Sequence, residues 1–250
     1  LEAMGVEIRT GSYVASVEQV KKDYDFVVLA VGAYKPGVLR LDEGEAVNAL
    51  EFLAQFKATD GKVDLGENVV VIGGGNTAMD TARAAKRNAG VKKVSLVYRR
   101  TKRYMPADAE ELELAIADGV EFCDLMAPKT LKNGVLTCEV MELGAPDASG
   151  RRSPQPIGRT VDIPADTVIS AIGEKVDTAY FEKNGVAVDE RGRAVTDGVC
   201  KSNGIYVIGD SRRGPATVVE AIADAAAAVR DILGAPEAKH FALNAAPAEL

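Results

Sequence analysis

The stretch that most constrains the fold is residues 69–83, where four β-branched residues run into three glycines and then into an alanine-rich segment. The run at 69–72 suits a strand that is buried on both faces of a parallel sheet. Glycine has no Cβ, so residues 73–75 permit a tight turn. Apolar residues at helical spacing follow, and we expect Asn76 or Thr77 to cap that helix.

The spacing Gly73-x-Gly75-x-x-Ala78 matches the fingerprint of a dinucleotide-binding turn, with alanine in the third glycine position. A strand, a glycine turn and a helix N-terminus in this order leave unpaired N–H groups and a partial positive charge, which suit a pyrophosphate. Taken alone, the pattern also fits a glycine turn that serves only the architecture. The next strand is therefore needed to decide between the two interpretations.

That next strand is expected at 93–98, and its end lies about 20 residues beyond the glycines, where an acidic residue would bind the ribose hydroxyls of NAD. The chain instead carries a cluster of cations there, Arg99, Arg100, Lys102 and Arg103. Because guanidinium groups match a phosphate in charge and geometry, the cluster predicts binding of the 2′-phosphate of NADP. A solvated basic loop is the alternative.

Composition excludes several classes of function. The 250 residues carry 30 basic and 37 acidic side chains, a net charge of −7, which argues against a nucleic-acid or anionic-membrane surface. Three cysteines without a C-x-x-C pair exclude a redox dithiol and a cysteine-ligated metal or cluster, and they favour a cytoplasmic location. A single histidine excludes a histidine-ligated metal site and a serine–histidine triad. No apolar run approaches the roughly 20 residues of a membrane helix.

Further elements are expected around the nucleotide unit. Apolar strands that end in glycine are predicted at 25–32, 167–173 and 204–210. The first two flank the nucleotide unit and suggest two crossings between two domains. Alternating segments at 130–163 predict an antiparallel excursion, and a long helix is predicted at 217–233.

Four motifs, at 73–83, 96–107, 169–173 and 206–210, occur in the order and at the intervals of a known family. In them the chain resembles the small (beta) subunit of NADPH-dependent glutamate synthase and related FAD/NAD(P)-dependent pyridine nucleotide-disulfide-type oxidoreductases. The resemblance covers about residues 1–233. It implies an α/β fold in which a Rossmann-like NADP domain is inserted into a partial FAD domain of the disulfide-reductase type.

The resemblance also implies a domain organisation. Residues 1–65 would be a partial FAD-domain segment, residues 66–165 the NADP-binding domain and residues 166–233 the return to the FAD-type domain. Beyond the resemblance, residues 234–250 are rich in alanine and proline, and we expect a loose C-terminal tail there. The family carries a first FAD fingerprint and, before it, a cysteine-rich iron–sulfur domain, and neither is among these residues. We therefore expect a segment of a larger reductase, one that keeps its NADPH site and binds FAD poorly or not at all.

Site residues carried over from the family fall into four groups. The NADPH pyrophosphate would be held by Gly73, Gly75, Asn76, Thr77 and Ala78, the 2′-phosphate by Arg99, Arg100 and Arg103, and FAD by Gly32, Gly209, Asp210 and the backbone at Thr217, with Gly173 near the nicotinamide. No catalytic side chain and no metal site is implied, because the flavin carries the chemistry. For Asp210, capping of its own turn is an equally good interpretation.

The implied activity is that of an NADPH-dependent flavin oxidoreductase. Hydride would pass from NADPH to FAD, and electrons would continue to iron–sulfur clusters or to an electron-accepting partner, the large subunit in glutamate synthase. A non-catalytic NADP(H)-binding or scaffolding module is the alternative. Tyr98 and Lys102 have the spacing of a short-chain dehydrogenase pair, but they stand at a strand end rather than on a helix after a catalytic serine, which indicates coincidence.

Overall fold

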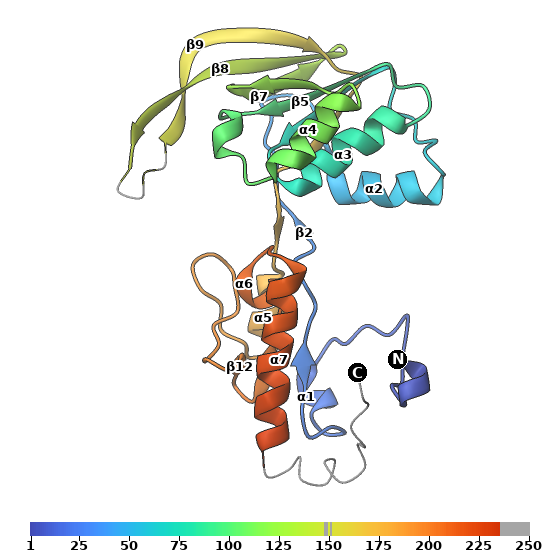
Figure 1. Cartoon of the computed structure of the whole chain (residues 1–250), viewed down its shortest axis with the longest axis vertical. Coiled ribbons are helices and arrows are strands. Elements are labelled where there is room, and N and C mark those ends of the chain that lie inside the picture. The colour runs from blue at the N-terminus through green and yellow to red at the C-terminus, as the bar shows by residue number, and fades with distance from the viewer. Residues whose placement is uncertain (148–149, 151, 236–250) are drawn as a thin grey trace. The chain divides into compact units, whose positions relative to one another are not determined.

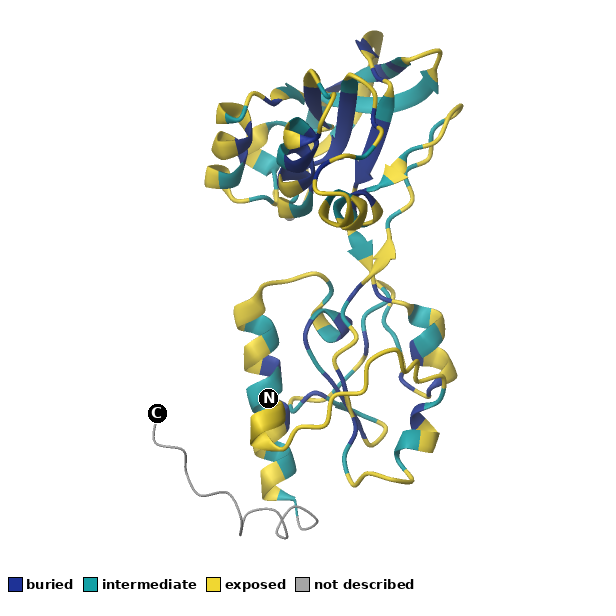
Figure 2. Cartoon of the chain, turned by 90° about the vertical axis from the view of Figure 1, so that its right-hand side faces the viewer, coloured by how far each residue is buried: buried dark blue, intermediate teal, exposed yellow. Residues whose placement is uncertain are grey.

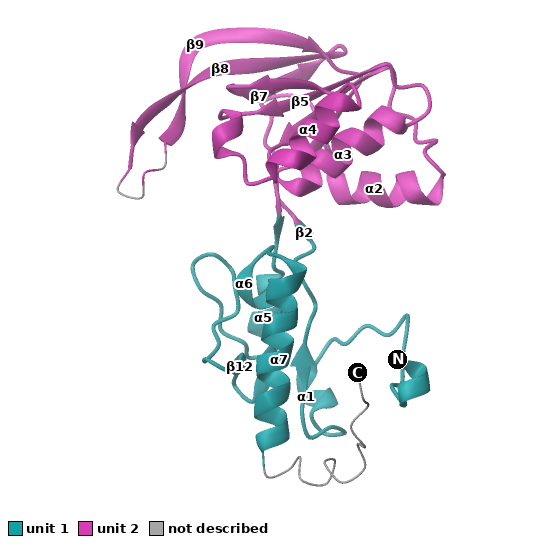
Figure 3. Ribbon diagram, viewed as in Figure 1, with its two compact units in different colours: residues 1–35, 174–250 teal, residues 36–173 magenta. Residues whose placement is uncertain are grey.

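The computed structural model describes residues 1–147, 150 and 152–235, and the chain forms two compact units (Figures 1 and 3). Unit 1 combines Leu1–Lys35 with Glu174–Leu250, and unit 2 is Pro36–Gly173. Unit 2 is therefore inserted in the sequence between two segments of unit 1. Residues 236–250, most of the predicted tail at 234–250, lie outside the described residues.

The centre of unit 2 is a five-stranded parallel sheet. Its strand order is β3 (Val47–Asn48), β10 (Thr167–Ala171), β4 (Asn68–Gly73), β5 (Lys93–Tyr98) and β6 (Glu121–Asp124). The predicted central strand is confirmed, since every side chain from Val69 to Ile72 is buried. Figure 2 shows the strands of this sheet largely in dark blue, the colour of buried residues.

Three helices cover one face of this sheet, α2 (Ala49–Ala58), α3 (Asn76–Arg87) and α4 (Ala109–Ala117) (Figure 1). The apolar cluster between the helices and the sheet includes Phe52, Met79, Leu112, Val69 and Val71. Alternate residues of β4 thus point into this layer, as the pleat of a strand requires.

An antiparallel sheet covers the opposite face and confirms the predicted antiparallel excursion. Its strands are β7 (Met126–Lys132), β8 (Val135–Pro146) and β9 (Arg152–Pro164). Leu136 and Ile163 pack with Val70 and Ile72. Because a parallel sheet is stable only when both faces are covered, this second layer completes the core of unit 2.

The boundaries of unit 2 differ from the predicted ones at 65/66 and 165/166, and the sheet gives the reason. Val47 of β3 is paired with Ile169 of β10, so the segment before residue 66 supplies an edge strand. Both β3 and β10 therefore belong to this fold, and the boundaries lie at 35/36 and 173/174.

Unit 1 contains a smaller sheet, with β1 (Val28–Leu29) parallel to β13 (Ile205–Val207) and β12 (Lys201–Ser202) antiparallel to β13. The strands predicted at 25–32 and 204–210 are thus only two and three residues long. β1 is an edge strand that pairs only with β13 among the described strands. The pairing joins Val28 to Tyr206 and Leu29 to Val207.

Helices and short strands complete unit 1. They are α1 (Val17–Val20), α5 (Thr178–Lys183), α6 (Asp210–Arg213) and α7 (Val218–Gly234), the 3₁₀ turn η1 (Glu2–Met4), and the strand pair β2 (Lys35–Pro36) and β11 (Glu174–Lys175). The helix predicted at 217–233 is confirmed as α7, with Thr217 as its N-cap. Within the part of the chain that is described, every helix is too short or too polar to cross a membrane.

The packing between the two sheets of unit 2 generates a prediction. Leu136 is fully buried there, so Leu136→Ala should destabilise unit 2 by about 2–5 kcal/mol through lost burial and the cavity left behind. Faster hydrogen exchange in peptides from β4 and β5 would report the loss. Leu114→Ala, on the 40% exposed position of α4, is the control and should change exchange little. Equal effects of the two variants would contradict the layered core.

Candidate functional site

The glycine turn joins β4 to α3 at the carboxyl edge of the parallel sheet. A Cβ on Gly73 would overlap the carbonyl oxygen of Ala171 and stand 2.9 Å from the Cβ of Ala78, so only glycine permits β10 and α3 to approach here. A Cβ on Gly75 would meet no atom within 4 Å. The backbone at Gly75 is therefore open to a ligand.

The predicted helix cap is wrong. Gly75, with extended backbone angles, is the N-cap of α3, and Asn76 is the first helical residue. Among the described residues, no acceptor is bonded to the N–H groups of Asn76 and Thr77. Because glycine offers no side-chain oxygen, those first N–H groups stay free for an anion at the positive end of the helix.

The side chain of Asn76 does not point to an open site. Its Oδ1 accepts the backbone N–H of Asp108 at 3.0 Å, and its Nδ2 donates to Oδ2 of Asp108 at 3.3 Å. Asp108 is the N-cap of α4, so the pair ties the starts of two helices together. Sequence analysis missed this partner, because only the fold brings residue 108 to residue 76.

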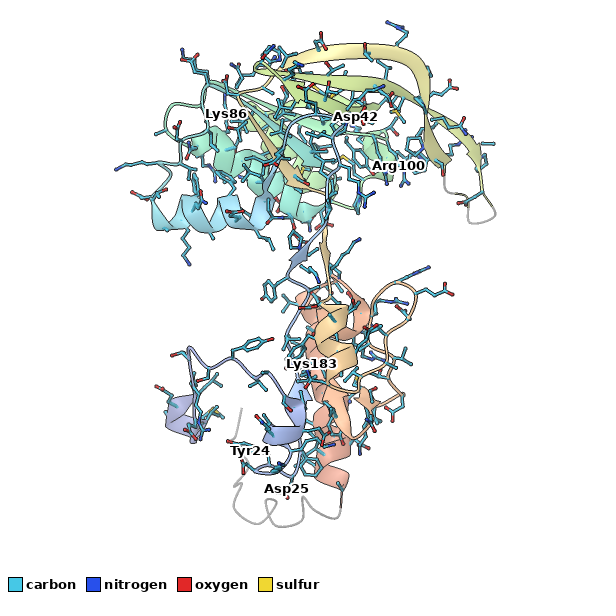
Figure 4. All side chains as sticks on the ribbon, turned by 180° about the vertical axis from the view of Figure 1, so that it is seen from behind. Tyr24, Asp25, Asp42, Lys86, Arg100 and Lys183 are labelled. Carbon is cyan, nitrogen blue, oxygen red and sulfur yellow. The ribbon has the colours of Figure 1, made fainter. Side chains whose placement is uncertain are left out.

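The cation cluster follows β5 directly. Within residues 1–147, 150 and 152–235, none of Arg99, Arg100, Lys102 and Arg103 forms an ion pair. The Nε of Arg100 is buried and has no hydrogen-bond partner there either. Figure 4 labels Arg100 among the side chains of unit 2. By contrast, Arg83 on α3 donates to Asp118 at 2.8 Å. Unpaired guanidinium groups are available to a phosphate, whereas Arg83 is held in a structural contact.

The parallel register brings the turn and the cluster to one edge. Ile72 is paired with Val97, so β4 and β5 end side by side. On the other side of β4, Ala171 is paired with Gly73, which places Gly173 just beyond the same edge. β5 and β6 lie on one side of β4, and β10 and β3 lie on the other, so the strand order reverses at β4. Ligands of open α/β sheets bind at such a switch point.

In unit 1, the four residues expected to contact FAD line one cavity of about 260 Å³. Gly32 and Gly209 have positive φ angles, +67° and +65°, and keep the wall free of side chains. One carboxylate oxygen of Asp210, Oδ1, accepts the N–H of Ala216 at 3.1 Å, which leaves the other available. The N–H of Thr217 is engaged by Glu220 in a capping box.

A buried carboxylate that sequence analysis missed supports this cavity. Asp224 on α7 is 2% exposed; its Oδ2 accepts the N–H of Gly209, and its Oδ1 accepts from Arg212 and Arg213. Burial acts to raise the pKa of Asp224, but the hydrogen bond of Arg213 and both guanidinium charges outweigh it and lower the pKa. An acidic residue in an alanine-rich helix was the available signal.

A larger open hollow of about 800 Å³ in unit 1 contains no predicted site residue. Its arginines include Arg193, which is paired with Asp189 at 2.6 Å, and Arg213, which is paired with Asp224. Since these charges are already matched, the smaller cavity is the better candidate. No cluster of three or more His, Cys, Asp or Glu side chains that could hold a metal occurs in the described residues.

Comparison with known proteins shows which family the chain resembles. The model of the family "Pyridine nucleotide-disulphide oxidoreductase" matches residues 1–225. Similar curated proteins are putative oxidoreductase YgfK of Escherichia coli O157:H7 (42% identity; 92% of this chain, 23% of that protein), the beta subunit of NADP(+)-dependent formate dehydrogenase of Moorella thermoacetica (36%; 89% and 34%) and the small chain of NADPH glutamate synthase of Azospirillum brasilense (34%; 93% and 54%). The chain thus spans about a quarter to a half of these relatives.

Solved structures show the same fold. FprA from Mycobacterium tuberculosis in complex with NADPH superposes with a TM-score of 0.70 at 23% identity, over 90% of this chain and 67% of that chain. Thioredoxin reductase from T. acidophilum gives 0.64 at 21% identity, over 84% and 65%. The predicted fold class, with an inserted Rossmann-like domain in a fold of the disulfide-reductase type, is confirmed.

The Asp224 contacts generate a pH prediction. The lowered pKa means that the ion pairs stabilise unit 1 above the unfolded value of about 4 and that this stability is lost as the pH falls through the folded-state pKa. At about pH 6, Asp224→Asn should cost about 3 kcal/mol, since it leaves two arginines without their buried partner.

Urea denaturation of wild type and of Asp224→Asn between about pH 2 and pH 6 measures the difference in their free energies of unfolding. This difference should shrink toward low pH. Glu7→Gln, in the exposed Glu7–Arg9 pair, is the control and should unfold like wild type at every pH. A difference that stayed constant down to about pH 2 would show that the charge of Asp224 is not the cause.

Proposed function

The chain belongs to the pyridine nucleotide-disulphide oxidoreductase family, as its motifs predicted, and we propose that it is the NADPH-oxidising part of a flavin-dependent electron-transfer enzyme. Hydride passes from NADPH to FAD, and electrons continue to iron–sulfur clusters or a partner subunit, as in the small subunit of glutamate synthase. The observation that carries the proposal is a set of cations beside the glycine turn, Arg99, Arg100 and Arg103, none of which forms an ion pair with the described residues.

The residues of unit 2 fit NADPH. The free N–H groups of Asn76 and Thr77 would bind the pyrophosphate, with Gly75 leaving room for it. Arg99 and Arg100 would bind the 2′-phosphate, which NADH lacks. Arg103 follows in the same loop and would add a third positive charge. Gly73, Ala78 and Gly173 would shape the crevice, with Gly173 on the nicotinamide side.

The cavity of unit 1 fits one part of FAD. Gly32 and Gly209 allow the backbone to approach a ligand closely, and the available oxygen of Asp210 would accept a hydroxyl of the ribityl or ribose chain. Thr217 would contribute through its position at the start of α7, because its N–H is already bonded. When bound, FAD accepts the two electrons of a hydride and releases them singly.

The chain's own cysteines cannot accept these electrons, because a free thiol is already reduced. Cys123, Cys138 and Cys200 are all free. Burial raises the pKa of the Cys138 thiol to about 12 and also raises those of Cys123 and Cys200. A separate acceptor is therefore part of the proposal, and two relatives are named as the small or beta chain of a larger enzyme, which supports it. A cytoplasmic location completes the proposal.

The first test measures cofactor preference. Wild-type chain should bind NADPH at least tenfold more tightly than NADH in calorimetric titrations, because a bidentate guanidinium–phosphate contact contributes about 1.4 kcal/mol or more. The variants Arg99→Ser and Arg100→Ser should lose most of that preference and leave NADH binding unchanged. Arg159→Ser removes an exposed cation of the same unit and is the control. Equal affinities of wild type for both nucleotides would overturn the proposal.

A second test separates the enzyme from a binding module. NADPH oxidation is followed at saturating NADPH with added FAD and an artificial electron acceptor. Turnover that depends on FAD supports the flavin enzyme. Tight NADPH binding without turnover under these conditions would favour a scaffolding or sensing module.

A further inference from the structure

The loop that carries the cations is closed by a single side chain. The hydroxyl of Tyr98, the last residue of β5, donates a hydrogen bond to the carbonyl oxygen of Tyr104 at 2.7 Å. Within the loop, the N–H of Tyr104 donates to the carbonyl oxygen of Thr101 at 3.0 Å, where the 3₁₀ turn η2 (Lys102–Tyr104) forms. Residues 98 and 104 therefore clamp the base of the cation loop.

The aromatic ring of the same tyrosine contacts the glycine turn. A Cβ on Gly74 would overlap the ring of Tyr98, so the ring lies directly against the Gly74 backbone. Just past the loop, the N–H of Ala107 donates to the carbonyl oxygen of Gly74 at 3.0 Å. Tyr98 thus touches both halves of the site, the turn through its ring and the loop through its hydroxyl.

In the part of the chain that is described, Tyr98 supplies the one side-chain hydrogen bond that the loop receives, and the other bonds of the loop join backbone groups, such as the N–H of Met105 and the carbonyl oxygen of Lys102 at 3.2 Å. The cations of the loop have no carboxylate partners in the described part of the chain, and the carbonyl oxygen of Arg100 accepts one longer bond, 3.3 Å, from the N–H of Leu125. A loop that is ordered before binding loses less conformational entropy when it receives a ligand. The clamp therefore restricts the backbone between residues 98 and 104, which includes Arg99 and Arg100.

We propose that Tyr98 is a positioning residue that sets the preference for a 2′-phosphorylated dinucleotide by clamping the cation loop through its hydroxyl. The inference rests on the proposed NADPH site. It also assigns the Tyr98 hydroxyl a role unrelated to proton transfer, since the hydroxyl already donates its hydrogen bond to the carbonyl oxygen of Tyr104.

Tyr98→Phe tests the clamp, because it removes one oxygen atom and keeps the ring on Gly74. Calorimetric titration of the full 250-residue chain with 2′,5′-ADP and 5′-AMP isolates the 2′-phosphate, and NADPH and NADH repeat the comparison on the whole cofactor. The variant should bind 2′,5′-ADP and NADPH about threefold to tenfold more weakly, the usual effect of one lost hydrogen bond. Binding of 5′-AMP and NADH should not change.

Tyr104→Phe is the matched control, since it removes a hydroxyl from the same loop while the carbonyl oxygen that accepts the bond remains. It should bind all four ligands like wild type. Hydrogen exchange gives a second readout: peptides covering 99–105 should exchange faster in Tyr98→Phe only. A merely structural role would instead weaken all four ligands together.

The outcomes distinguish this inference from the proposed function. If wild type does not prefer NADPH, the NADPH site itself fails and the clamp fails with it. If wild type prefers NADPH and the arginine variants lose that preference, but Tyr98→Phe retains it, the clamp alone is overturned. A uniform loss of affinity for all ligands in Tyr98→Phe also overturns the clamp.

Discussion

The close approach of three elements at Gly73 is the constraint on which the rest of unit 2 depends. With no Cβ at this position, the carbonyl oxygen of Ala171 on β10 and the methyl group of Ala78 on α3 both reach the end of β4. β10 can then pair with β4 in register, and α3 can start immediately beyond the sheet. Gly75 then serves as the N-cap of α3 and leaves the first N–H groups of that helix free.

The two faces of the sheet are both covered, which supports the edge that carries the candidate site. Helices α2, α3 and α4 bury one face, and β8 and β9 bury the other. The carboxyl edge is then the open rim of a closed, three-layered core, and loops at such a rim are held by strands that cannot move far. The Tyr98 hydroxyl joins the end of β5 to the carbonyl oxygen of Tyr104 in the cation loop.

The arginines of the chain separate into two groups by their partners. Arg83 on α3 and Arg213 on α6 are neutralised by Asp118 and Asp224, and each joins helices together. Arg99 and Arg100 have no such partner among the described residues. A paired guanidinium contributes to stability, whereas a guanidinium without a carboxylate partner can still bind an anionic ligand. Counting basic residues in the sequence does not distinguish the two groups.

The sequence by itself determined the elements whose cause is local: the buried strand at 69–72, the glycine turn, the helix α7, and the order of motifs that identified the family. Only the tertiary structure decided what depends on distant partners. It set the short length of β1, the inclusion of β3 in unit 2 and the bond between Asn76 and Asp108. Local periodicity and turn chemistry act within a few residues, but strand pairing and ion pairing join positions whose separation along the chain leaves no local signal.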